Sequence, residues 1–294
     1  AVRVLASQDS TISTGSGSGN IVFNNTINGN SANSGNLTLN AGTGNIDFNG
    51  AIGNSTTFAN LTITNSALTN FNSTVNIGTN LTQTNTATNT TTFANTVNVG
   101  GAATLRGTIF NINNSWNSTG VTSFTNSGLI TKSATGNITA VGGFNTSGDI
   151  NLASNISTTN TNLSIGGNLT IAEGKSVVLS TSTGAGNITV TGQTQGTSGG
   201  TNEALALTAG AGNITFSDLV GRKEDFDLTT LTINSVATAT FNKKVDLKGT
   251  LSQLAGSVAT TFNNEVDVGT LTLIGTAFNF NNNLNSDSTT TITN

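Results

Sequence analysis

The clearest pattern in this chain is the alternation of aliphatic and polar residues in many short segments. In each segment two aliphatic side chains lie on one side, and polar side chains, mostly Thr, Asn or Asp, lie on the other. Gly, Asn and Ser follow closely after each segment. A period of two between turn residues predicts short β-strands. The clearest of them are 36–39, 61–64, 75–77, 97–99, 163–165, 169–171, 231–233, 245–247, 266–268 and 271–273.

Two short phrases recur along the chain. The phrase Gly-x-Gly-Asn-Ile-x-(Phe/Val) occupies 17–23, 42–48, 184–190 and 210–216. A second phrase, Phe-x-x-x-(Val/Ile/Leu), starts at Phe23, Phe71, Phe93, Phe241, Phe262 and Phe280. Among neighbouring copies, the spacing is shortest from 262 to 280 and longest from 184 to 210. A period of roughly 20 residues, built from short β-type phrases, predicts a stacked solenoid.

These patterns predict an all-β fold, a parallel β-helix of roughly 20 residues per coil in a single domain over 1–294. We expect a right-handed winding, because parallel crossovers almost always have that hand. An antiparallel sandwich is the main alternative, but its hairpins favour Asn-Gly or Asp-Gly turns. Asn-Gly occurs only at 28–29 and 49–50, and Asp-Gly is absent. We expect Phe and aliphatic ladders inside the coils and buried Asn residues stacked at the turns.

The composition narrows the possible chemistry. The chain has no His and no Cys, so a Ser-His triad, a Cys nucleophile, a disulfide and the usual zinc sites are excluded. A pI near 4.6 argues against a nucleic-acid partner. No apolar run reaches the ~20 residues of a transmembrane segment. The chain starts at Ala1 without a visible signal peptide, so we expect a removed leader or a longer parent protein.

The charges are concentrated in the last third of the chain, most densely at 222–227. This run, Arg-Lys-Glu-Asp-Phe-Asp, is predicted to be an exposed loop, with a docking or ion-binding patch as the alternative. Its mixed signs favour the simple loop. A second longer turn is expected at 194–202, which is rich in Gly, Ser and Thr.

Paired carboxylates are the usual machinery of glycoside hydrolysis. A coil of about 21 residues would stack Asp246 over Asp267, with Glu265 beside them. However, Asn76 and Asn98 take the same place in other copies of the phrase, which favours a solvent-facing strand position. The sequence therefore predicts no catalytic, cofactor-binding or metal site and no enzyme. A polysaccharide-degrading enzyme stays an alternative, with the 222–227 cluster as its only candidate in a long insertion and Glu224 and Asp225 as the residues to mutate in its test.

Three further features have a structural and a functional interpretation. Trp116, the only Trp, is interpreted as a core or corner filler, with a glycan-stacking platform as the alternative. The Gly-x-Gly-Asn-Ile phrases precede strands, so they are interpreted as turns and not as phosphate loops. Thr-x-Thr pairs suggest an ice-binding face, but their intervals look irregular. These pairs are 62/64, 82/84, 189/191, 230/232 and 270/272.

The phrases Gly-Asn-Ile-Thr, Gly-Asn-Leu-Thr and Leu-Thr-Leu-x-Ala-Gly give the chain a resemblance to a known class of repeats. It resembles the β-strand repeat regions of large bacterial exoproteins, the filamentous-haemagglutinin-like and autotransporter-like passenger segments. The resemblance implies a right-handed parallel β-helix outside a bacterial cell, acting as a stalk, adhesin or surface layer.

We therefore expect an extracellular structural element of the cell surface, a fibre, stalk or surface layer, with adhesion as an additional role. Strand-like segments at 1–6 and 289–294 would leave sticky sheet edges unless they are covered. Self-association, end to end or side by side, is the predicted partnership, with a cell-surface or glycan ligand as a further possibility. The alternatives are the polysaccharide-degrading enzyme and an ice- or glycan-binding module.

Overall fold

The computed structural model describes residues 1–84 and 89–294 and consists of parallel β-strands stacked as a β-solenoid. No segment in these residues is helical, so none could cross a membrane as a helix. The coils take roughly 22 residues each, about 13 turns in all, close to the predicted period. Parallel pairing rules out the antiparallel sandwich. The chain divides into two compact units, unit 1 (Ala1–Gly142) and unit 2 (Gly143–Asn294).

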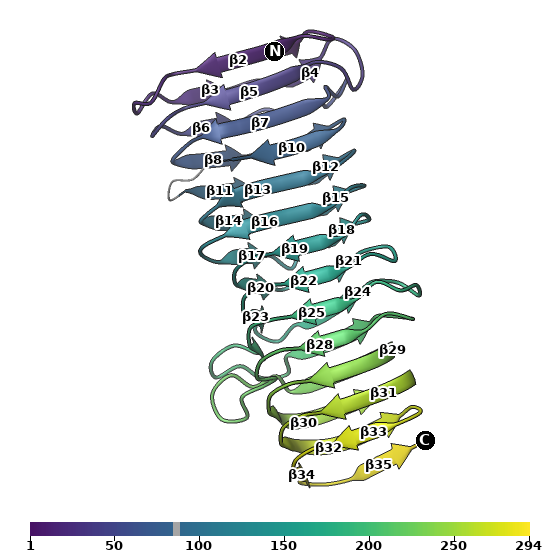
Figure 1. Cartoon of the computed structure of the whole chain (residues 1–294). Helices are drawn as coiled ribbons and strands as arrows, with labels where there is room; N and C mark the ends of the chain where they lie inside the picture. Colours follow the sequence, from purple (N-terminus) through teal and green to yellow (C-terminus); the bar gives the residue numbers. More distant parts are fainter. Residues whose placement is uncertain (85–88) are drawn as a thin grey trace. The chain divides into compact units, whose positions relative to one another are not determined.

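In unit 1 each coil contributes one strand to each of three parallel stacks (Figure 1). The first stack contains β1 (Val2–Val4), β4 (Ile27–Gly29), the single residue Ile52, β9 (Val75–Ile77), β12 (Val97–Val99), β15 (Trp116–Ser118) and β18 (Ile138–Ala140). The second contains β2 (Asp9–Ser13), β5 (Asn36–Asn40), β7 (Asn60–Asn65), β10 (Asn80–Gln83), β13 (Ala103–Gly107) and β16 (Thr122–Asn126). The third contains β3 (Ile21–Phe23), β6 (Ile46–Phe48), β8 (Leu68–Phe71), β11 (Thr90–Phe93), β14 (Ile109–Ile112) and β17 (Ile130–Lys132).

Unit 2 is built the same way, and some of its strands bend around a corner into the next stack. Its first stack contains β19 (Phe144–Thr146), β22 (Leu163–Ile165), β25 (Ile188–Val190), β28 (Ile214–Phe216), the end of β29 (Thr230–Phe241), β31 (Gly256–Phe262) and β33 (Phe278–Phe280). The second contains β20 (Ile150–Leu152), β23 (Leu169–Ile171), β26 (Thr194–Gln195), the residue Val220, the starts of β30 (Val245–Gln253) and β32 (Val266–Ile274), and β34 (Leu284–Ser286). The third contains β21 (Ile156–Ser157), β24 (Ser176–Ser180), β27 (Ala204–Thr208), the start of β29, the ends of β30 and β32, and β35 (Thr290–Thr293).

The predicted Phe ladders form the core of both units. In the third stack of unit 1 the rings of Phe23, Phe48, Phe71 and Phe93 stack face to face, with centroids 4.6–5.3 Å apart. In the first stack of unit 2 the same arrangement joins Phe216, Phe241, Phe262 and Phe280 at 4.8–5.2 Å. Offset stacking of buried aromatic rings adds to the hydrophobic stabilisation. The ladders follow from the sequence because one Phe recurs at the same point of successive coils.

Asparagine side chains form a second kind of ladder on the outside of the coils. In unit 1, Asn98 Nδ2 donates to Asn76 Oδ1 (2.7 Å), and Asn117 Nδ2 donates to Asn98 Oδ1 (2.9 Å). In unit 2, Asn263 is joined to its neighbours in the same way, at 3.0 and 2.9 Å. The amide stacking is confirmed, and so is the solvent-facing strand position predicted for Asn76 and Asn98, which are half-buried. Asn263 lies in a turn and is exposed, so the prediction of buried Asn at the turns is wrong for this ladder.

The Gly-x-Gly-Asn-Ile phrases are turns that lead into strands, as predicted. Gly42 and Gly210 have φ of 58° and 57°, in the left-handed region where a side chain is unfavourable. A Cβ on Gly44 would run into the carbonyl oxygen of Gly19 in the preceding coil. The glycines therefore allow neighbouring corners to approach closely, and no phosphate-binding helix follows them.

Candidate functional site

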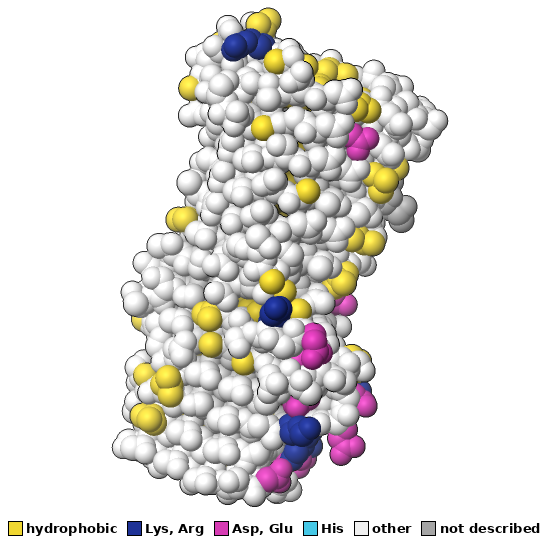
Figure 2. Space-filling view, turned by 180° about the vertical axis from the view of Figure 1, so that it is seen from behind, with side chains coloured by type: hydrophobic (Ala, Val, Ile, Leu, Met, Phe, Trp, Pro, Cys, Tyr) yellow, Lys and Arg dark blue, Asp and Glu magenta, His cyan; other side chains and the backbone are white. Residues whose placement is uncertain are grey.

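Acidic and basic side chains gather over the C-terminal coils of unit 2 (Figure 2). Along the second stack, Asp246 is in register with Asp267, and Asp267 is in register with Asn285. The predicted stacking of Asp246 over Asp267 is therefore confirmed. Carboxylates on adjacent strands, about 4.8 Å apart, repel each other. The row requires cations close to it.

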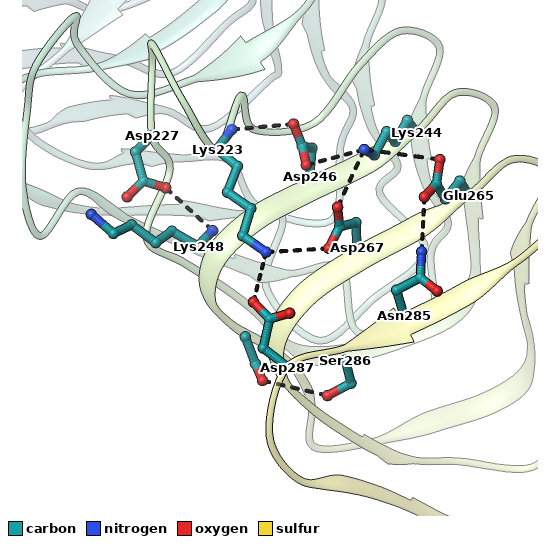
Figure 3. A network of polar contacts seen from close by, with 11 residues as sticks. Lys223, Asp227, Lys244, Asp246, Lys248, Glu265, Asp267, Asn285, Ser286 and Asp287 are labelled. Atoms are coloured by element: carbon teal, nitrogen blue, oxygen red, sulfur yellow. Dashed lines mark hydrogen bonds and ion pairs between the residues drawn. The ribbon is translucent and has the colours of Figure 1, made fainter.

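Two lysines supply the positive charge (Figure 3). Lys244 Nζ lies 3.3 Å from Asp246 Oδ1, 3.4 Å from Asp267 Oδ2 and 3.9 Å from Glu265 Oε2. Lys223 Nζ lies 3.2 Å from Asp267 Oδ1. Each carboxylate of the stacked pair is thus within reach of at least one ammonium group.

Lys223 also reaches Asp287 in a coil further along the stack, with its Nζ 2.7 Å from Asp287 Oδ2. This contact spans 64 residues of sequence. The backbone amide of Lys223 donates to Asp246 Oδ2 (3.2 Å), so Lys223 contacts three acidic residues, two of which are in the row. The network therefore ties successive coils together through one side chain.

The interactions in this network favour the charged forms of Lys223, Lys244 and Asp267. The hydrogen bond to Asp287 raises the pKa of Lys223, although partial burial opposes it. Burial alone would lower the pKa of Lys244, but attraction to Asp246 outweighs it and raises the pKa. Burial alone would raise the pKa of Asp267, but hydrogen bonds and attraction from Lys223 and Lys244 hold it below its ordinary value. A carboxylic acid that donates a proton in glycoside hydrolysis needs a raised pKa, the opposite of Asp267.

The segment 222–227 is a surface loop, as predicted, but most of its side chains have local partners. Arg222 pairs with Asp225 (3.3 Å), and its guanidinium lies 4.9 Å from the centre of the Phe226 ring. Glu224 and Asp225 are exposed. Partial burial raises the pKa of Asp227, even though the backbone amide of Lys248 donates to its carboxylate.

A buried glutamate, Glu203, lies next to this loop and was not singled out from the sequence. Its side chain is 0% exposed, and Oε1 accepts a hydrogen bond from Thr197 Oγ1 (2.7 Å). Its Oε2 has no hydrogen-bond partner within the described residues. The turn 196–203 packs against 222–227, since the amide of Gly199 donates to the carbonyl of Asp225 (3.2 Å). The first two residues of the predicted long turn at 194–202 form the short strand β26, and the turn itself follows this strand. Nothing in a Gly/Ser/Thr-rich turn indicates that its one glutamate is buried.

The remaining candidates have structural positions. Trp116 is buried, and its Nε1 donates to Thr122 Oγ1 (2.9 Å), so it is a core filler and the glycan-stacking interpretation is wrong. Within residues 1–84 and 89–294 no three carboxylates lie close enough together to hold a metal ion.

The Thr-x-Thr pairs are more regular than their sequence intervals indicate. Thr230, Thr250 and Thr270 stack in register, and so do Thr232, Ser252 and Thr272. The interval between 230 and 270 spans two coils, and the pair at 250/252 was missed because its second residue is Ser. The argument that the intervals are irregular is therefore wrong for this stack.

The fold defines this chain as a parallel β-solenoid protein. Comparisons with protein families, with curated proteins and with solved structures found no match for it.

Proposed function

We propose that this chain is a structural element of a bacterial cell surface, a stalk, fibre or surface-layer component located outside the cell. The observation that supports the proposal is the in-register stacking of coils in both units, with Phe ladders inside and Asn ladders outside. Each coil is held to the next by backbone hydrogen bonds, packing and side-chain ladders, an arrangement suited to mechanical persistence. The stacked carboxylates fit this role, because the two lysines that bridge coils neutralise them.

The proposed partner is a second copy of the same chain, stacked end to end. Ile292 in β35 pairs with the buried Leu273 in the inward row, yet it is 41% exposed. At the other end, Ile12 pairs with the buried Leu39 and is also exposed. Open strand edges with exposed inward residues favour pairing with another sheet. A head-to-tail contact of this kind generates a filament.

Sedimentation velocity over a wide concentration range, combined with electron microscopy, tests this assembly. We expect concentration-dependent growth into filaments, and Ile292→Lys should shift the association to higher concentrations. Ile274→Lys is the matched control, because Ile274 is 43% exposed but points outward one coil away. A monomer at every concentration, or equal effects of both variants, would contradict end-to-end stacking. Protease treatment of intact source cells tests the location, since a surface protein is degraded while cytoplasmic markers survive.

A further inference from the structure

Unit 1 has a groove of about 540 Å³ along the edge of its first stack, where β9, β12, β15 and β18 end. Its volume is in the range of ordinary ligand sites, about 300–1,000 Å³. The residues that line the groove belong to unit 1, whereas the charged network belongs to unit 2.

The groove arises because the coils of unit 1 change length at this corner. From β4 to β5 and from Ile52 to β7, the chain takes long loops, whereas β9 and β10 are joined by two residues. The long loops are fixed to each other by two hydrogen bonds. Thr57 Oγ1 donates to Asn33 Oδ1 (2.6 Å), and the backbone N–H of Asn33 donates to the backbone carbonyl of Thr57 (3.0 Å). Asn33 and Thr57 therefore form a firm wall beside the shorter corners.

One side of the groove is the Asn ladder of Asn76, Asn98 and Asn117. The backbone below it is already paired, because β12 hydrogen-bonds to β9 on one side and to β15 on the other. An extended peptide would therefore find no free strand edge to join. The polar side chains that face the groove are amides and hydroxyls. Asn98 uses one N–H and one lone pair in the ladder, and its amide has a second N–H and further lone-pair capacity for a ligand.

The lining is uncharged in every described residue that contributes to it. Ile77, Val99 and Val141 add aliphatic surface beside the amides. Successive amides are one coil apart, about 4.8 Å, close to the length of one sugar unit in an extended glycan. Sugars present hydroxyls at their edges and C–H groups on their faces, which matches this combination of amide and aliphatic surface.

We infer that this groove binds a neutral, linear oligosaccharide, with one sugar unit per coil. The absence of charge in the lining disfavours a polyanionic chain, which would need cations to bind it. The inference goes beyond the proposed structural role and does not depend on it, because the groove belongs to a single chain.

Isothermal titration calorimetry with the full chain tests the inference. The probes are cellohexaose, xylohexaose and chitohexaose, with hexagalacturonate as the charged comparison. We expect at least one neutral hexasaccharide to bind, and its shorter homologues to bind more weakly, since they contact fewer coils. Asn98→Leu should weaken binding about tenfold, the effect of losing one or two hydrogen bonds.

Asn263→Leu is the matched control. Asn263 is also the middle of a three-residue ladder, between Asn242 and Asn281, but it lies in unit 2. Asn117→Leu is a second test, because Asn117 is exposed at the end of its ladder and loses a single ladder bond. No binding of any neutral probe, tighter binding of hexagalacturonate, or equal losses in Asn98→Leu and Asn263→Leu would overturn the inference. The filament assay is independent, so either proposal can fail alone.

Discussion

A buried lysine gives this protein a pH dependence that can be calculated. Lys132 lies at the end of β17, in register with Ile112, and its side chain is 1% exposed. Its Nζ donates to the carbonyl oxygens of Ser133 and Thr135, both at 2.8 Å. Burial lowers the pKa of Lys132 from 10.5 to about 8, because no carboxylate compensates for the lost hydration.

The sign of the effect follows from proton linkage. Below pH 8 both states are protonated, and the folded protein bears the full cost of a buried charge. One pH unit of pKa difference is worth about 1.4 kcal/mol, so this cost is about 3 kcal/mol. Between pH 8 and 10.5 the unfolded chain binds more protons than the folded one, so the free energy of unfolding rises with pH. Most of the cost, about 2.5 kcal/mol, is regained by pH 10.

Few other groups interfere in this window. The chain has no His, Cys or Tyr, which removes three of the side-chain types that titrate in or near it. Lys223 and Lys244 have raised pKa values, so the stability that they contribute is lost only when the pH rises above about 10.5.

Urea unfolding at about pH 7 and pH 10 measures the effect. We expect the wild-type chain to gain stability with pH and Lys132→Met, which keeps the side-chain length without the charge, to gain little. Lys175→Met is the control, because Lys175 is exposed and its loss should leave the wild-type pH dependence intact. The reasoning is refuted if Lys132→Met and wild type show the same rise.

Three further predictions concern the ladders and the charged network. Phe71→Ala should cost about 3–5 kcal/mol, because it leaves a cavity between two stacked rings. Phe280→Ala should cost less, because Phe280 is only half-buried. Equal losses in thermal unfolding would contradict the ladder argument. Asp267→Asn should lower the free energy of unfolding by no more than about 1 kcal/mol, since its ion pairs are partly exposed. Because the pKa of Asp267 is lowered, its stabilising contribution is present above pH 3.8 and is lost as the pH falls through the pKa of the folded protein. A larger loss of stability that salt does not reduce would contradict this. Gln253→Leu removes the acceptor of the buried Thr260 hydroxyl (2.6 Å) and should cost about 1–3 kcal/mol in urea unfolding; a neutral effect would show that the hydroxyl finds another partner.

The parts of the fold that repeat along the sequence could be predicted from it. Parallel coils put residues one period apart on top of each other, so the Phe spacing was enough to predict the aromatic ladders. The same reasoning correctly stacked Asp246 over Asp267, which are one coil apart. The polarity of these positions also showed that they face solvent.

The parts that depend on side-chain reach and loop conformation could not be predicted. Lys223 bonds to Asp287 because a flexible side chain extends across the coils between them, and no sequence interval encodes this. The burial of Glu203 depends on how two irregular turns, 196–203 and 222–227, pack against each other. The groove of unit 1 depends on a difference in corner length between coils, which a search for repeats averages away.

The Phe phrase disappears between 93 and 241, and the structure of unit 1 gives a physical reason. After Phe93, the next positions in the same row are Ile112 and Lys132. The aromatic volume moves to Trp116 in the first stack, whose ring meets Phe93 edge-on with centroids 5.0 Å apart. Trp116 also lies 5.6 Å from the ring of Phe124 in the second stack, so aromatic rings from different stacks fill the interior together. Because protein interiors are close-packed, the inward side chains of each coil must together fill a fixed volume, and any of the three stacks can contribute the large side chain. The row after Phe93 therefore holds no further aromatic ring at Ile112 or Lys132, and the ammonium of Lys132 turns back to the carbonyls of its own corner. The interruption of the repeat therefore marks where the aromatic volume changes stacks, while the coil geometry continues.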